Sequence, residues 1–502
     1  MTAPSYRSVL KSTSVIGGAA FINMLIGMVR TKFVAVLLGP YGVGLMGVYM
    51  TIVGMVSTIS SMGTDTSGVR QIAEAHGVND ETQISRMVAT LLRTVWVTGL
   101  IGAGIMILGS SWLSRIALGT ADHAGSIAWL GLAVLLTNVS IGWTCLLQGT
   151  RRIGVMAKAG MMGSLISLLF SVPFFYRWGV QGIVPGLILA AMAMLATTWW
   201  FSHRVPIRSV VVPWRESKTL ALQLLHFGLP VMCSGIVAAC SAYFIRALLV
   251  RQVGLDGVGL WQAAFNLSGV LVNFILGAMV ADYYPRLVAV ADDPDRVCEE
   301  VNAQTEIALF LAVPGLAATL VFAPLAVTIF YSGKFDASIE ILRWFVFGLF
   351  GRIIAWPMGL VLLAKGMGKT YFTMEALGNI VYIVAIWFCT HMWGLPGAGL
   401  AFLLFHVFNT IMVRIVVRGV SRTVWSRSNA LHVLCFGAVL TLMGLISWFI
   451  VDPVWHYAIN VPLLGVVGLY CLSYLSKKSG ITVQSLWSRM VNGLDRRAPP
   501  GA

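Results

Sequence analysis

Fourteen apolar stretches, each long enough to cross a lipid bilayer as a helix, occupy most of this 502-residue chain. A spanning helix needs about 20 largely apolar residues, and open backbone cannot face lipid, which favours helices over strands. Only 11% of the residues are charged, against about 25% in soluble domains. The sequence predicts an all-α polytopic membrane protein with about fourteen transmembrane helices, at residues 9–38, 42–63, 87–109, 124–147, 155–178, 180–201, 219–250, 258–284, 303–331, 339–364, 371–393, 396–417, 430–451 and 454–475.

A glycine-rich pattern occurs twice in the chain, 215 residues apart, at residues 38–45 (LGPYGVGL) and 253–260 (VGLDGVGL). A second pair, Trp178–Gly182 and Trp393–Gly397, keeps the same offset. Shared spacing of this kind indicates a duplicated unit. Each copy holds six predicted helices, an even number, so both copies cross the membrane in the same direction as a parallel repeat.

The duplication predicts two pseudo-symmetric six-helix lobes followed by two further helices. The predicted boundaries are 1–218 for the N-terminal lobe, 219–429 for the C-terminal lobe, 430–475 for the extra helices and 476–502 for an amphipathic tail on the inner leaflet.

Basic residues are distributed very unequally between the two sets of loops. Twenty-three lie in loops on one side of the predicted membrane and four on the other. Because Lys and Arg accumulate in cytoplasmic loops, both termini are expected in the cytoplasm. The net charge of +15 is spread over every inner loop, which argues against nucleic acid as a partner.

Seven basic residues fall inside the predicted helices, where each ionised side chain costs about 2.5–3.5 kcal/mol on insertion scales. Arg93 and Arg414 lie near inner helix ends, where snorkelling explains them. Arg30 and Arg246 each stand about nine residues before their copy of the glycine-rich pattern, and Arg352 stands in mid-helix. Because few carboxylates are near, a cationic chamber is expected, which would bind an anion such as phosphate or pyrophosphate through guanidinium forks.

Other polar positions are weaker candidates for the same chamber. Lys32 and Arg343 lie toward outer helix ends and could face either the chamber or the headgroups. Asn266 and Asn273, with Gln262, form a polar stripe that could meet a hydroxyl-rich sugar. His406 and Asn409 could be an ion-coupling pair, although such residues more often hydrogen-bond neighbouring helices.

Enzyme and metal signatures are missing from the sequence. It holds no HExxH, GxSxG or P-loop pattern, and its seven cysteines form no CxxC pair. We expect no catalytic residues, no metal and no cofactor. A membrane-embedded glycan polymerase stays open as an alternative, but such enzymes need a long outer loop, and the longest here is about fifteen residues.

Several motifs in order resemble one family of membrane proteins. Arg246 with residues 253–262, then Asp282–Leu287 and Gly333–Phe335, together with Arg30 and residues 38–45, are similar to the O-antigen translocase and lipid III flippase group. This group belongs to the multidrug/oligosaccharidyl-lipid/polysaccharide (MOP) exporter superfamily. The resemblance covers about residues 1–420.

This resemblance implies a flippase of the bacterial inner membrane that moves an undecaprenyl-pyrophosphate-linked oligosaccharide by alternating access. The cargo is an O-antigen or exopolysaccharide repeat unit or a lipid III-like glycan, and Arg30, Arg246 and, less strongly, Arg352 are expected to hold its pyrophosphate. Expected partners are membrane lipid and, further, a polysaccharide polymerase and chain-length regulator. A lipid II or multidrug exporter of the same superfamily is the alternative.

Two features depart from the family pattern. Many members end after twelve helices, so the last two helices are unexplained by the resemblance. Gly269 stands where lipid III flippases carry an acidic residue, which leaves carboxylate-based ion coupling open.

Overall fold

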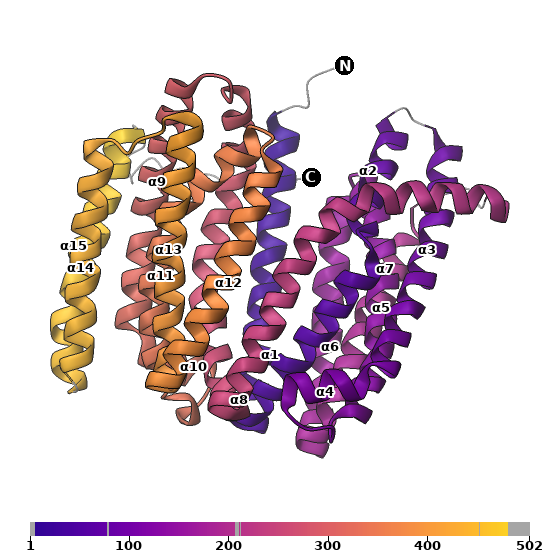
Figure 1. Cartoon of the computed structure of the whole chain (residues 1–502), viewed down its shortest axis with the longest axis horizontal. Helices are drawn as coiled ribbons and strands as arrows, with labels where there is room; N and C mark the ends of the chain where they lie inside the picture. The colour runs from indigo at the N-terminus through magenta and orange to yellow at the C-terminus, as the bar shows by residue number, and fades with distance from the viewer. Residues whose placement is uncertain (1–5, 78–79, 206–209, 211, 451, 480–502) are drawn as a thin grey trace, which may run out of the picture. The chain divides into compact units, whose positions relative to one another are not determined.

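The computed structural model describes residues 6–77, 80–205, 210, 212–450 and 452–479. Within these ranges the chain is helical throughout, with no strand, and eleven helices are long and apolar enough to cross a membrane. This confirms the predicted all-α polytopic class (Figure 1). The elements are α1 Tyr6–Ser61, α2 Thr64–Gly77, α3 Glu81–Leu108, α4 Ser110–Leu118, α5 Ala124–Gly149, α6 Ile153–Trp178, η1 Gly179–Gly182, α7 Ile183–Ser202, α8 Trp214–Ala289, α9 Pro294–Val321, α10 Ala323–Phe330, η2 Gly333–Phe335, α11 Ser338–Ala364, α12 Gly368–Trp393, α13 Leu395–Ser421, α14 Arg427–Phe449 and α15 Pro453–Ser479.

The chain forms two compact units. Unit 1 comprises Met1–Ala263, Val327–Ser338 and Ile386–Gly397, and unit 2 comprises Ala264–Ala326, Ile339–Ala385 and Ala398–Ala502. Unit 1 therefore contains the whole predicted N-terminal lobe, the first part of α8 and two short segments from later in the chain.

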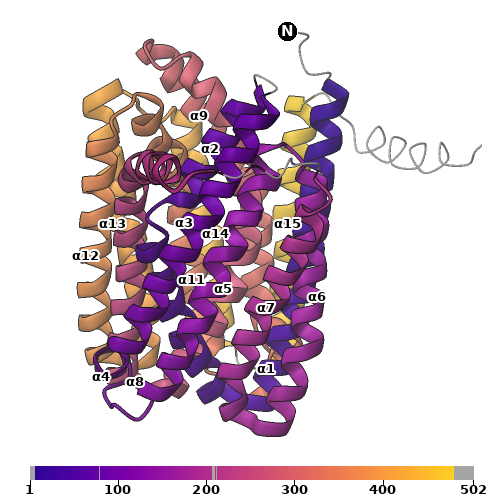
Figure 2. The same ribbon diagram turned by 90° about the vertical axis from the view of Figure 1, so that its right-hand side faces the viewer.

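Within unit 1, α7 packs against both α5 and α6, while α3 packs on α5 and α1 on α6. Figure 2 shows α5, α6 and α7 running side by side. Near the ends where α5 and α7 finish, the core is a cluster of fully buried aliphatic side chains that includes Leu91, Leu146 and Ile72. Ile72 belongs to α2, the short helix between the second and third predicted spans, so α2 packs on this core.

The repeated glycines adopt matching backbone conformations. Gly39 interrupts α1 with φ 66° and ψ −170°, and Gly254 interrupts α8 with φ 71° and ψ 176°. Gly179 and Gly394, the second repeated pair, both have positive φ, at 55° and 60°. Left-handed φ values are strained for residues with a Cβ, which explains why glycine occupies these positions in both copies. The backbone thus supports the duplication inferred from the sequence.

The two glycine-rich junctions also pack directly on each other. A Cβ added to Gly44 would overlap the carbonyl oxygen of Leu255, and a Cβ added to Gly259 would overlap the carbonyl oxygen of Pro40. The 215-residue offset converts Gly44 into Gly259 and Pro40 into Leu255. The contact is therefore reciprocal, as in an isologous two-fold interface, and it brings backbone against backbone with no room for side chains.

Two short helices were not predicted as separate elements. The apolar runs near residues 110–118 and 323–330 were expected to be loop or the end of a longer helix, but they form α4 and α10. The two short helices are nearly equivalent in the repeat, because adding the offset of 215 residues to the range of α4 gives a range that overlaps α10. Apolar composition continues through both junctions, so hydropathy alone gave no boundary there.

In unit 2, the two C-terminal helices α14 and α15 are attached to α9, and Figure 1 shows them as a yellow pair beside it. Glu306 of α9 accepts hydrogen bonds from the Tyr474 hydroxyl and, at 2.5 Å, from Lys478 Nζ. The Tyr474 ring stacks on Phe310 with a centroid separation of 4.1 Å. The tail predicted to lie on the inner leaflet falls almost entirely outside the described residues.

Replacing Glu306 with alanine is expected to lower the thermal unfolding temperature. The substitution removes the hydrogen bonds that Tyr474 and Lys478 of α15 donate to α9, while the contact of His456 with Val321 O remains. Hydrogen bonds to charged groups contribute about 1.5–3 kcal/mol each, less for partly exposed Lys478. Thermal unfolding of the purified protein in detergent measures the effect. Glu299→Ala is the matched control, because Glu299 is exposed on the same helix. An equal, small change in both variants would contradict this attachment.

Candidate functional site

The guanidinium of Arg246 is held in a fixed orientation inside unit 1. Its Nη2 donates to Gln262 Oε1 at 2.8 Å, and its Cζ lies 5.2 Å from the ring centroid of Trp261. In a straight helix these side chains, 16 residues apart, would be separated by about 24 Å. The kink at Gly254 folds the two halves of α8 together, so the glycine-rich junction is what positions Arg246.

Gln262 was predicted to belong to a sugar-binding stripe with Asn266 and Asn273. In the structure its side-chain oxygen accepts a hydrogen bond from Arg246. Asn266 and Asn273 lie on the part of α8 that belongs to unit 2, and both are exposed. Their proposed role toward a sugar stays a prediction.

Arg30 lies at nearly the equivalent position in α1, and two nitrogens of its guanidinium lack a partner among the residues that the structure describes. Its Nε and Nη2 atoms are buried and have no hydrogen-bond partner in the described part of the chain. The ion pairs found there do not include Arg30 either. Leaving a buried charged donor unsatisfied costs more than the usual 1–3 kcal/mol penalty for a neutral group. An anion with oxygen acceptors would remove this penalty.

Lys32 is occupied by the protein itself. Its Nζ donates to the carbonyl oxygen of Thr328 at 2.8 Å and to that of Tyr331, at the end of α10. These carbonyls belong to the last turn of a helix, where no intrahelical donor is available and cations are favourable. Lys32 therefore fastens α1 to this segment, and we assign it no substrate contact.

A matching contact exists in the other copy of the repeat. The Tyr243 hydroxyl donates to Leu113 O at 3.1 Å, and Arg251 Nη2 donates to Ile116 O at 3.3 Å. Adding the repeat offset of 215 residues to Leu113 and Ile116 gives Thr328 and Tyr331, the two residues whose carbonyl groups Lys32 binds. Helix α1 of the first copy thus binds the end of α10 in the second copy, and α8 of the second copy binds the end of α4 in the first. The side chains that bind these carbonyl groups do not correspond under the offset, because residue 247 is alanine, so the repeat alone would not have predicted the contacts.

In unit 2, predicted site residues of α11 and α13 lie near the contact between these helices. His406 is 6% exposed and its Nδ1 has no partner in the described residues. Helices α11 and α13 meet at Gly351, whose carbonyl accepts a hydrogen bond from Thr410 at 3.1 Å. The half-buried Arg352 is the next residue of α11, so it lies beside the contact with the helix that carries His406. Asn409 is only half-buried.

Arg343 differs in its surroundings from Arg93 and Arg414, the two arginines that were interpreted as snorkelling to the inner surface. Arg343 is half-buried, and its Nε is buried without a hydrogen-bond partner among the described residues. Arg93 donates to Val212 O at 2.8 Å. Arg414 is exposed and lies 4.6 Å from the Trp425 ring centroid. Of the predicted site residues, Arg30, Lys32 and Arg246 thus lie in unit 1 and the others in unit 2.

Solved structures of other transporters show which fold this chain shares. The chain is similar to the lipid II flippase MurJ in an inward closed conformation, with a TM-score of 0.66, 12% identity and coverage of 92% of this chain and 99% of that one. It is also similar to an inward-facing multidrug resistance MATE family transporter of the MOP superfamily, with a TM-score of 0.65, 17% identity and coverage of 80% and 96%. The fold is that of MOP-superfamily transporters.

Sequence comparison gives the family. Residues 33–340 match the polysaccharide biosynthesis protein family, and the chain belongs to it. It is 23% identical over 379 residues to the lipid III flippase of Escherichia coli K12, covering 73% of this chain and 88% of the relative. It is 21% identical over 403 residues to the lipopolysaccharide biosynthesis protein WzxC of the same organism, covering 78% and 77%.

Proposed function

We propose that this protein is a flippase that moves a polyprenyl-pyrophosphate-linked oligosaccharide across the bacterial inner membrane. The observation that carries the proposal is Arg30, whose buried Nε and Nη2 have no acceptor in the described part of the chain. A pyrophosphate supplies several charged acceptor oxygens in the geometry that a guanidinium fork binds best. The relatives named above as lipid III flippase and WzxC support the same cargo class.

Arg246 is the second proposed pyrophosphate ligand, since the repeat places it at nearly the position of Arg30. Gln262 and Trp261 hold its guanidinium in one orientation before substrate arrives, which reduces the ordering cost of binding. We propose Arg352 and Arg343 as weaker contributors, and Asn266 and Asn273 as sugar contacts. His406 and Asn409 are kept as candidate coupling residues, supported only by the partnerless, buried Nδ1 of His406.

The proposed architecture is fourteen crossings in two six-helix lobes plus two helices, with both termini in the cytoplasm. Three of the eleven apolar helices span 40, 50 and 36 residues, and the last of these lies within the 76-residue α8, so each helix is long enough for two crossings of about 20 residues. Each of the three is interrupted by a glycine with positive φ, namely Gly39, Gly179 and Gly254. The lobe boundaries stay those inferred from the repeat, 1–218 and 219–429, with the extra helices at 430–475 and the tail at 476–502.

The proposed mechanism is alternating access, in which the two lobes rock about the contact between Gly44 and Gly259. Backbone-to-backbone packing suits such a pivot, because no side chain has to change rotamer as the helices roll. The pyrophosphate would stay on the arginines while the prenyl tail remains in lipid. The membrane lipid and the lipid-linked glycan are the partners this requires; a polymerase and a chain-length regulator are further proposed partners.

Reconstituted protein tests the proposal against its alternatives. Purified full-length protein in vesicles, loaded with radiolabelled lipid-linked oligosaccharide in one leaflet, is expected to move label to the other leaflet without changing its chain length. Formation of longer glycan would favour a membrane polymerase instead. Transfer of lipid II or of cationic drugs with no transfer of the oligosaccharide would favour the other exporters of the same fold.

A further inference from the structure

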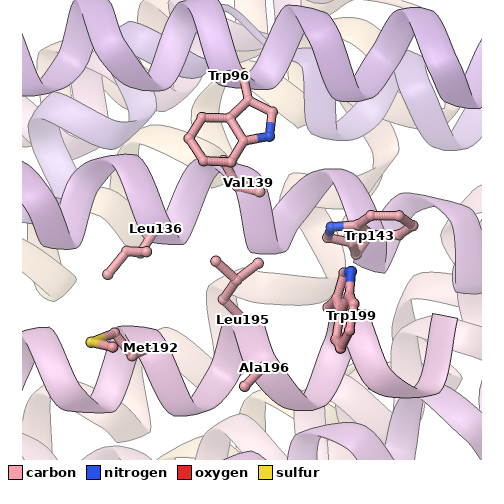
Figure 3. A pocket seen from close by; sticks show the side chains of 8 residues that line it. All are labelled: Trp96, Leu136, Val139, Trp143, Met192, Leu195, Ala196 and Trp199. Atoms are coloured by element: carbon pink, nitrogen blue, oxygen red, sulfur yellow. The ribbon is translucent and has the colours of Figure 1, made fainter. Parts of the chain in front are cut away.

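A pocket of about 400 Å³ lies on the outside of unit 1, between α3, α5 and α7. Figure 3 shows Trp96 from α3, Trp143 from α5 and Trp199 from α7 around it. The other five lining residues are aliphatic or methionine. Trp96, Met192 and Trp199 are 46–48% exposed, so this face is open to the surrounding lipid.

The pocket is separate from a second pocket on the same helices. That pocket, of about 340 Å³, is lined by Thr137 and Ser140 of α5, Met194 of α7 and Asp65 of α2. These α5 and α7 positions stand one residue from those lining the outer pocket, such as Leu136, Val139 and Leu195, and neighbouring residues of a helix point about 100° apart. The two pockets therefore lie on different faces of the helix pair.

Two hydrogen-bond donors are aimed into the outer pocket. In Figure 3 the indole nitrogens of Trp143 and Trp199 point toward the same small region. Neither indole has a hydrogen bond to an acceptor in the described part of the chain. Buried or lipid-facing indole N–H groups normally find a partner, and hydrocarbon cannot supply one. A single oxygen atom placed between the two rings could accept both hydrogen bonds.

Two arginines lie near this end of the pocket, although no basic residue is among its lining residues. The His203 ring is tilted against both indoles, with centroid distances of 5.2 Å to Trp143 and 4.5 Å to Trp199. Arg204 follows it, 5.4 Å from the Trp200 ring centroid. Arg93 lies one turn before Trp96 on α3, about 4.5 Å further along the axis. A ligand held here would place its acyl chain among the aliphatic side chains and an anionic headgroup among these cations.

A larger pocket farther along α5 and α7 provides an internal contrast. It has about 600 Å³ and is lined by Trp129, Leu132 and Ile188, with Ser126 and Gln181 as its polar residues. Neither its lining residues nor those of the outer pocket include a basic residue. What distinguishes the outer pocket is the pair of indole N–H groups of Trp143 and Trp199, at the end where α5 and α7 finish.

We propose that the pocket between Trp96, Trp143 and Trp199 binds one anionic glycerophospholipid from the bilayer leaflet at that end of the protein. One headgroup or ester oxygen accepts from Trp143 and Trp199, and the phosphate lies near Arg204 and Arg93. Since the lipid bridges α3, α5 and α7, it stabilises the packing of this bundle. The proposal does not depend on which cargo the protein moves.

Native mass spectrometry of the delipidated full-length protein tests the site by titration with phosphatidylglycerol and with phosphatidylethanolamine. The wild type is expected to retain one phosphatidylglycerol with at least tenfold preference. The double variant Trp143→Phe/Trp199→Phe keeps the rings but removes both donors, and about tenfold weaker retention is expected. Arg93→Gln/Arg204→Gln is expected to abolish the preference between the two lipids.

Trp129→Phe is the matched control, because Trp129 lines the larger pocket farther along α5 and α7, and its retention should equal the wild type. Should the double Phe variant unfold, Ala196→Leu fills the same pocket without removing a contact and should also weaken retention. Equal retention in wild type, Ala196→Leu and the Arg variant would overturn the site. Preferential retention of added polyprenyl phosphate over phosphatidylglycerol would overturn the assignment of the ligand.

Discussion

Replacing Gly44 with valine is expected to reduce transport at least tenfold and to lower the thermal unfolding temperature. The new Cβ would meet the carbonyl oxygen of Leu255 and, at 2.9 Å, the backbone nitrogen of Gly259. Backbone atoms cannot move aside as a side chain does, so the two helices must separate. Overpacking typically costs about 1–3 kcal/mol, and we expect a value at the upper end. Gly259→Val should behave alike, because its Cβ meets Pro40 in the same way.

Gly54→Val and Gly277→Val are the matched controls for this pair. Each lies on the same helix as its partner variant, and nothing lies within 4 Å of an added Cβ. Both should retain transport, apart from the small helix-propensity change. Gly44→Val with the activity and unfolding temperature of Gly54→Val would show that the junctions do not need their close approach, and the pivot would have to be abandoned.

The double variant Arg30→Gln/Arg246→Gln is expected to lower the rate of lipid-linked oligosaccharide transfer by about a hundredfold. A hydrogen bond to a charged group contributes about 1.5–3 kcal/mol, or at least about tenfold for each arginine. Glutamine keeps a polar side chain of similar reach but loses the charge. Transfer into the opposite leaflet of reconstituted vesicles is the measurement, with protein amount and vesicle leakage held equal.

Arg414→Gln serves as the control for this double variant. Arg414 also lies within an apolar helix, but it is exposed and lies over the Trp425 ring, so it should transfer cargo at the wild-type rate. Wild-type transfer in the double variant would remove both arginines from the site. An equal loss in Arg414→Gln would attribute the effect to general charge rather than to a specific position.

Much of the fold was predictable because membrane insertion constrains the sequence so strongly. Runs of about 20 apolar residues located the helices, and the repeated glycines at 39 and 254 marked the two kinks with nearly the same dihedral angles. The short helices α4 and α10 were missed because apolar composition runs through their boundaries. The caps that Lys32, Tyr243 and Arg251 make on these helices were missed with them.

The site was harder to predict, because its chemistry depends on which residues the kinks bring together. Arg246 and Gln262 are 16 residues apart, and no helical periodicity relates them; only the folded junction makes them partners. Lys32 is a basic residue in an apolar helix, as a cavity cation would be, yet two backbone carbonyl groups bind its ammonium group. Arg30 lies in the same apolar helix, but its buried Nε and Nη2 have no such partners in the described residues. Only three-dimensional packing could reveal this difference in hydrogen bonding.

Arg30→Met gives the most direct test of the central claim, that Arg30 is kept uncompensated in order to bind a pyrophosphate. Removing a charge whose buried donors lack acceptors should stabilise the substrate-free protein. We therefore expect the variant to unfold at a higher temperature than wild type. Farnesyl pyrophosphate should raise the unfolding temperature of wild type by mass action and should have little effect on Arg30→Met. A variant that unfolds at a lower temperature and keeps the full ligand-induced rise would contradict the account.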